Sequence, residues 1–215
     1  MYESGPGEGV QVIELDRGDF LRLGAGGVLA AAAAGFAPVT ARAQVPHPAP
    51  KEDDVAYLSF ATIAERASRD VYRAALRQRA TGFTATERRR LGVIAAAKRT
   101  HVMRLDAALG ADAPLTEDFV TVLPDGAVAT KAKALALAMQ LETLLVRLYL
   151  NGVGYAGDSG TRLLLGRLLG YDAQALSWLR LRARLPSPSG LESPIDLEPA
   201  ADALDGFLST PDFPD

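Results

Sequence analysis

Residues 61–76, ATIAERASRDVYRAAL, and residues 138–154, AMQLETLLVRLYLNGVG, carry the same pair of polar side chains in otherwise apolar helical stripes. Glu65 precedes Tyr72 by seven residues, and Glu142 precedes Tyr149 by seven. This spacing places both side chains on one face of a helix, two turns apart. The recurrence indicates an internal duplication. Both tyrosines are expected in the core, hydrogen-bonded through their hydroxyls rather than acting as redox groups.

Four amphipathic helices follow from apolar residues that recur at intervals of three and four. They are expected over residues 52–76, 84–109, 131–150 and 161–185. Thr84 or Thr86 is the expected N-cap of the second helix, and Gly110 is its expected stop. The segment NGVG at 151–154 is expected to end the third helix.

The connections predict how these helices are joined. They are short within each pair, whereas residues 111–130 form a long connection between the pairs, with two prolines and a glycine. Two helical hairpins joined by a crossover are the connectivity of a ferritin-like four-helix bundle rather than of an up-down-up-down one. The sequence therefore predicts an all-α fold of this kind over residues 52–185.

Each helix has polar residues in the middle of its inner stripe. These residues are Glu65, Lys98 with His101, Glu142, and Asp172. Burying a charge costs several kcal/mol unless the charge is paired or bound to a metal. The four helices are therefore expected to enclose a cluster of carboxylates, one lysine and one histidine.

With these segments and residues 161–180, TRLLLGRLLGYDAQALSWLR, the chain resembles the exported ferritin-like domain proteins over about residues 52–185. The resemblance implies two metal ions, held by a Glu on the first and third helices and a Glu-x-x-His on the second and fourth. Glu65 and Glu142 match the two lone glutamates, and His101 matches one histidine. Asp172 matches one acid, with a side chain shorter by one methylene.

Two other positions depart from this pattern, because Lys98 replaces an acid and Ala175 replaces the second histidine. An ammonium a few Å from a divalent cation in a poorly screened interior is repelled by several kcal/mol. The favoured interpretation is that Lys98 takes the place of the metal, so that no cofactor is bound. Its ammonium would pair with Glu65, Glu142 or Asp172.

A single Fe, Mn or Zn ion is the alternative cofactor. Glu65, His101 and Glu142 would bind it, and Asp172 or water would complete the shell. The long stem of Lys98 would then have to carry the ammonium toward the end of the bundle. A competent di-iron oxidase or iron-storage protein would need ligands that the motif does not supply.

The N-terminal residues 1–43 have the features of an export signal. Residues 23–39, LGAGGVLAAAAAGFAPV, are apolar, and Ala41-Arg42-Ala43 has the small-x-small cleavage pattern. Residues 16–22, DRGDFLR, resemble a twin-arginine motif with Gly18 in place of the second arginine. Export to the periplasm, the cell surface or the medium is expected, and residues 44–51 form a linker. The alternative is a retained helix that anchors the protein to a membrane.

Charge is unevenly divided along the chain. Residues 44–185 hold 20 Lys and Arg against 14 Asp and Glu, whereas residues 186–215 hold seven acids and no base. This acidic tail, with a short helix expected over 198–208, is predicted to wrap the bundle. The net charge of −3 indicates no nucleic-acid partner, and the absence of cysteine excludes disulfides and thiolate metal sites.

Three functions are compatible with these features. The first is a non-catalytic structural or interaction protein on a ferritin-like scaffold. The second is a metal-dependent redox or iron-handling protein that uses the inward-facing carboxylates and histidine. The third is a membrane-associated module, if the N-terminal helix is retained. A homo-oligomer is compatible with each of them, and the sequence indicates no substrate.

Overall fold

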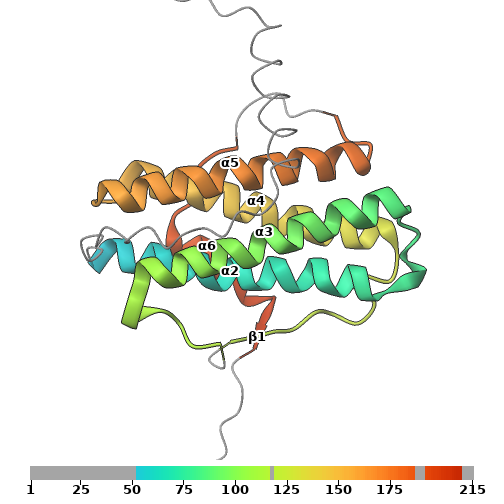
Figure 1. Ribbon diagram of the computed structural model, residues 1–215, viewed down its shortest axis with the longest axis horizontal. Helices are drawn as coiled ribbons and strands as arrows, with labels where there is room; N and C mark the ends of the chain where they lie inside the picture. The colour runs from blue at the N-terminus through green and yellow to red at the C-terminus, as the bar shows by residue number, and fades with distance from the viewer. Residues whose placement is uncertain (1–51, 117–118, 187–191, 210–215) are drawn as a thin grey trace, which may run out of the picture. The chain divides into compact units, whose positions relative to one another are not determined.

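A computed structural model describes residues 52–116, 119–186 and 192–209. The signal-like segment 1–43 and the linker 44–51 lie outside the described residues. Four long helices form two antiparallel hairpins (Figure 1). Their bounds are α2 Glu52–Arg77, α3 Ala85–Leu109, α4 Lys131–Tyr155 and α5 Ser159–Arg182. The predicted all-α, ferritin-like architecture is confirmed.

Local sequence chemistry sets several helix ends. Thr84 is the N-cap of α3 and forms a capping box with Glu87, in which each side chain accepts a hydrogen bond from the other residue's backbone N–H. Gly110 ends that helix with φ at 61°, a conformation that favours glycine. It begins the short 3-10 helix η2, Gly110–Asp112, and a second 3-10 helix, η1 Arg79–Thr81, precedes α3.

The third helix is longer than predicted. Residues 151–154 were expected to end it, but α4 continues through them to Tyr155. The reason is tertiary packing, because a Cβ on Gly152 would lie 2.7 Å from Leu165 Cδ1 of α5. Gly152 thus permits close approach of the two helices of the second hairpin rather than terminating a helix. At the turn that follows, the buried carboxylate of Asp54 accepts hydrogen bonds from the backbone N–H groups of Gly157 and Asp158.

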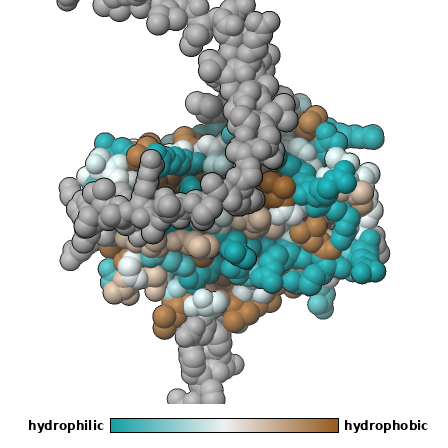
Figure 2. All heavy atoms as spheres, in the orientation of Figure 1, coloured by the Kyte–Doolittle hydropathy of each residue, from teal (hydrophilic) through white to brown (hydrophobic). Residues whose placement is uncertain are grey.

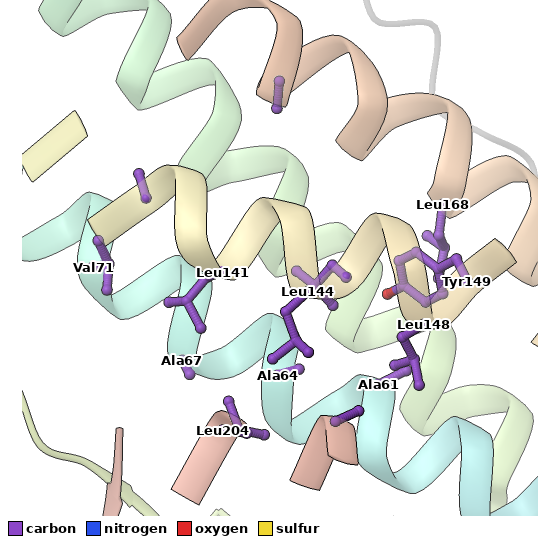
Figure 3. Close-up of a cluster of buried hydrophobic side chains, with 14 of the residues drawn as sticks. Ala61, Ala64, Ala67, Val71, Leu141, Leu144, Leu148, Tyr149, Leu168 and Leu204 are labelled. Carbon is purple, nitrogen blue, oxygen red and sulfur yellow. The ribbon is translucent and has the colours of Figure 1, made fainter. Parts of the chain in front are cut away.

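Small residues bring the two hairpins together. Buried alanines of α2 lie opposite buried leucines of α4, as Figure 3 shows for Ala61, Ala64, Ala67, Leu141, Leu144 and Leu148. Pairing a methyl group with a branched side chain lets the helices approach closely without a void. On the described part of the face in Figure 2, hydrophilic and apolar residues are interspersed, which is usual for a protein surface.

The crossover between the hairpins runs along α2 (Figure 1). Arg66 donates to the carbonyl oxygens of Pro114 and Leu115 at 2.9 and 3.0 Å. Asp70 accepts from Thr121 in the two-residue strand β1, Val120–Thr121. Because the crossover returns to the opposite end of the bundle, α3 and α4 run in the same direction.

The described part of the tail packs on the bundle. Helix α6, Leu197–Asp205, buries Leu204 against α2 and α4 (Figure 3) and covers about the range predicted for it. Asn151 Nδ2 donates to Ile195 O at 2.8 Å, and Arg147 Nε donates to Ser193 O at 2.9 Å. Strand β2, Leu208–Ser209, pairs antiparallel with β1, which the sequence pattern did not predict. Over the described ranges, none of the helices is both long and apolar enough to cross a membrane.

The close approach at Gly152 generates a paired prediction. Gly152→Ala should lower the free energy of unfolding by about 1–3 kcal/mol, because the added methyl group overlaps the buried Leu165 side chain. Gly154→Ala, on the same helix with open space at its Cβ, should raise it by up to about 1 kcal/mol through helix propensity. Urea denaturation measures both variants. Equal changes in the free energy of unfolding of the two variants would contradict the packing role assigned to Gly152.

Candidate functional site

All five predicted polar residues lie together at the centre of the bundle. Glu65 comes from α2, Lys98 and His101 from α3, Glu142 from α4 and Asp172 from α5. Each side chain is at most 3% exposed. Their position in the middle of each inner stripe made this convergence predictable, because the stripes of a bundle face one axis.

The ammonium of Lys98 occupies the middle of the cluster. Its Nζ lies 2.7 Å from Asp172 Oδ1, 3.0 Å from Glu142 Oε2 and 3.1 Å from Glu65 Oε2. It donates hydrogen bonds to Asp172 and Glu142. The contact with Glu65 is an ion pair without hydrogen-bond geometry, so Glu65 Oε2 has no hydrogen-bond partner among the described residues. The sequence predicted pairing with one of the three carboxylates, and the ammonium contacts all of them.

The two tyrosines bind the glutamates reciprocally. Tyr72 of α2 donates to Glu142 Oε1 of α4 at 2.9 Å, whereas Tyr149 of α4 donates to Glu65 Oε1 of α2 at 2.7 Å. Ser68 adds a second donor to Glu142 Oε1 at 2.9 Å. The prediction of core tyrosines with hydrogen-bonded hydroxyls is confirmed. The repeated Glu–Tyr spacing in the sequence thus becomes a swapped pair of hydrogen bonds between the hairpins.

His101 contacts the same cluster from α3. Its Nδ1 lies 3.0 Å from Glu65 Oε1 and 3.6 Å from Asp172 Oδ1. An ionised carboxylate only accepts hydrogen bonds, so the network assigns the hydrogen of this contact to Nδ1. The ring of Tyr171 meets the imidazole edge-on, with centroids 5.4 Å apart. Tyr171 is more than half exposed, so it covers His101 from the surface.

Burial and the neighbouring charges both shift the pKa values of these groups. Burial alone would raise the pKa of Glu65, but Lys98 and His101 lower it to about 2. Burial and the Glu65 carboxylate raise the pKa of Asp172 well above its usual range, against the opposing effect of Lys98. Burial would lower the pKa of Lys98, but Asp172, Glu142 and Glu65 raise it above its ordinary value. The lysine is therefore charged at neutral pH.

The cluster has more acid than base. Three carboxylates against one ammonium would give these four groups a net charge of −2 if all three were ionised. Asp172 has the weakest set of donors, since among the described residues it accepts a hydrogen bond from Lys98 alone and its Oδ2 is buried without a partner. Its raised pKa agrees with this geometry. Asp172 is thus the group that most readily keeps a proton in the dry interior.

Burial and the carboxylates also raise the pKa values of Tyr72 and Tyr149 well above the usual range. Their hydroxyls therefore stay protonated and act as donors. The arrangement as a whole is a buried network of hydrogen bonds and ion pairs among residues of the four helices. It can hold charge and protons at fixed positions, and its donors are directed at carboxylates of the protein itself.

The residues present do not fit a pair of metal ions. Such a centre takes four carboxylates and two imidazoles, whereas Ala175 offers no ligand atom. The Lys98 ammonium lies about 3 Å from the carboxylate oxygens that a cation would bind. Among the described residues, Glu65, His101 and Asp172 each offer a ligand atom, and these atoms lie within 4.8 Å of one another. The sequence suggested Glu65, His101 and Glu142 for a single ion, with Asp172 or water completing the shell.

Two further residues belong to the site, Ser68 and Tyr171. The sequence places Ser68, a small polar residue, one turn after Glu65 on the inner stripe of the first helix. It could not show that Ser68 donates to Glu142, because Glu142 lies on another helix. Tyr171 precedes Asp172 in the sequence and gave no signal of its own, because its contact with His101 depends on how α5 faces α3.

Comparison with known proteins covers the same part of the chain. A family model described as a ferritin-like domain matches residues 53–184, which is more than half of the sequence. The matched range starts at the second residue of α2 and ends two residues beyond α5, so it includes both hairpins and the crossover. No curated protein and no solved structure matches the chain.

Removing the central cation should destabilise the protein. Lys98→Met leaves three buried carboxylates without their counter-ion and should lower the free energy of unfolding at pH 7 by about 3–5 kcal/mol. The loss should shrink near pH 5, as protonation of the carboxylates removes the repulsion. Lys133→Met, at an exposed position of α4, is the matched control and should change little. Chemical denaturation at both pH values measures this, and an equal loss at the two would contradict it.

The low pKa of Glu65 predicts a pH dependence of its own. An acid whose folded-state pKa is depressed stabilises the protein above its unfolded-state value of 4.5, and that contribution is lost as pH falls toward 2. Glu65→Gln should therefore be less stable than the wild type at pH 7, by on the order of 3 kcal/mol. The difference should narrow between pH 4.5 and 2. A difference that stays constant over that range in urea titrations would show that the Glu65 carboxylate is not held ionised.

Proposed function

Because this chain belongs to the ferritin-like domain family, we propose that it is a non-catalytic structural or interaction scaffold. In this proposal the metal centre that such bundles build from facing carboxylates and histidines has been replaced by a buried lysine–carboxylate network. The fold is retained for its shape and stability, and the interior no longer takes part in redox chemistry.

The position of Lys98 Nζ is the observation that carries this proposal. The ammonium lies within 3.1 Å of a carboxylate oxygen from each of the other three helices. Those oxygens are the hard ligands that iron or manganese would use. A cation at the same point would face a fixed positive charge in a poorly screened interior and would be repelled by several kcal/mol. Ala175 supports the same reading from the other hairpin, where an imidazole ligand is missing.

A metal-binding redox or iron-handling protein is the second candidate. The convergence of Glu65, His101 and Asp172 within 4.8 Å favours it, since one imidazole and two carboxylates can hold Fe, Mn or Zn. It requires Lys98 to leave the cluster, which would give up three contacts of the ammonium at once.

The proposal also includes export. The apolar residues 23–39 followed by Ala41-Arg42-Ala43 support secretion as a folded scaffold outside the cytoplasm, with a retained N-terminal helix as the anchored form. Cell fractionation of the full chain, beside a variant lacking residues 1–43, separates the two forms. A chain found only in the cytoplasm would rule out this part of the proposal.

Metal content tests the scaffold directly. The full chain, expressed with iron and manganese supplied, should contain less than about a tenth of an equivalent of metal by elemental mass spectrometry. The double variant His101→Ala, Glu142→Ala should give the same value. Close to one equivalent in the wild type, lost in that variant, would overturn the scaffold proposal and favour the metal-binding candidate.

A second variant restores the missing ligands. Lys98→Glu combined with Ala175→His removes the ammonium and supplies the fourth carboxylate and the second imidazole. This variant should take up iron or manganese where the wild type does not, because the residues then complete the ligand set. Lys98→Glu alone should be markedly destabilised, since it adds a buried negative charge to three carboxylates.

A further inference from the structure

A groove on the outside of the bundle forms a second candidate site, away from the buried network. It has a volume of about 580 Å³ and lies between α4, the end of α5 and the tail that packs on them. Its walls are mainly apolar, with Met139, Leu144, Leu185, Ile195 and Phe207 among them. This volume is within the range of about 300–1,000 Å³ found for small-molecule sites.

Two guanidinium groups line this apolar groove. Arg147 comes from α4 and Arg180 from α5, and the described lining residues include no acid. Arg147 Nε is occupied by Ser193 O. Arg180 Nε is buried and has no hydrogen-bond partner in the described part of the chain, and the Nη2 of the same side chain makes only a long contact of 3.4 Å with Pro186 O. A buried donor without an acceptor destabilises the folded protein, and because this Nε is enclosed, only the Nη end of Arg180 can meet a ligand.

Among the described residues, no acid supplies an acceptor for Arg180 Nε. The acidic residues of α6, Glu198, Asp202 and Asp205, are exposed to solvent. Residues 187–191, Ser-Pro-Ser-Gly-Leu, follow Pro186 in the sequence and contain no carboxylate. The groove therefore combines two guanidinium groups, no acid among its described lining residues and an apolar floor.

This combination selects one class of ligand. The Nη end of a guanidinium is planar and matches the two oxygens of a carboxylate, and this end remains for a ligand because Arg180 Nε is enclosed and Arg147 Nε is bonded to Ser193 O. The apolar walls suit an unbranched hydrocarbon chain and disfavour a second charge. We propose that the groove binds an aliphatic monocarboxylate of the medium-chain fatty acid type, with its carboxylate on Arg180 and Arg147. The exported scaffold would then carry or sense such a molecule, independently of the central network.

Titration of the full chain with sodium octanoate, followed by calorimetry, tests this site. Saturable binding of one molecule is expected, and 1-octanol, which has the same chain without the charge, should bind at least tenfold more weakly. Acetate, which has the charge without the chain, should also be at least tenfold weaker. Equal binding of octanol, equal binding of acetate, or no saturable binding of octanoate would overturn the proposal.

Variants locate the site on the molecule. Arg180→Gln and, separately, Arg147→Gln should each weaken octanoate binding at least tenfold while the helical circular dichroism stays unchanged. Arg167→Gln, at an exposed position of α5 outside the groove, is the matched control and should bind as the wild type does. Loss of binding in Arg167→Gln to the same extent would show general charge attraction and refute the site. Binding retained by both groove variants would refute it as well.

Discussion

The contact of one ammonium with three carboxylates is the constraint on which the interior of this bundle depends. Lys98 reaches three other helices at once, over 2.7–3.1 Å. Desolvating these charges is costly, and their attraction offsets the cost only when the geometry is close. Each helix is therefore held at one rotation and one height at its midpoint. The contacts of the surrounding alanine and leucine core are non-directional, so they specify the register of the helices less strictly than these ion pairs do.

Tyrosine hydroxyl groups supply further hydrogen bonds to the carboxylates that Lys98 contacts. Tyr72 and Tyr149 each donate across the hairpin boundary, so both lone glutamates are tied to the opposite hairpin as well as to Lys98. Because burial and the nearby carboxylates raise the pKa values of both phenols, these donors remain available over the physiological range. The cluster is thus a charged centre with a neutral, hydrogen-bonding rim. Two of its buried oxygens, Glu65 Oε2 and Asp172 Oδ2, have no hydrogen-bond partner among the described residues.

Periodicity in the sequence was sufficient to predict the four helices and the central residues. Glu65 and Asp172 could be placed because a charge in an apolar stripe must face the same axis as its neighbours. The pattern could not show that Tyr72 bonds Glu142 rather than the glutamate on its own helix, since that depends on how two helices approach. Gly152 was misinterpreted for the same reason: local sequence suggested a helix end, and packing on Leu165 decided otherwise. The groove arginines gave no sequence signal, because the tail forms one wall.

The 2.7 Å contact between Lys98 and Asp172 joins a base of the first hairpin to an acid of the second. Two copies of the second hairpin would place Glu142 and Asp172 in the cluster twice and would bring in no ammonium, because Lys98 lies on α3. Like charges at that distance repel in a dry interior. Self-pairing of the second hairpin is therefore disfavoured relative to its pairing with the first. The second hairpin thus depends on the first for the counter-ion of its two buried carboxylates, Glu142 and Asp172.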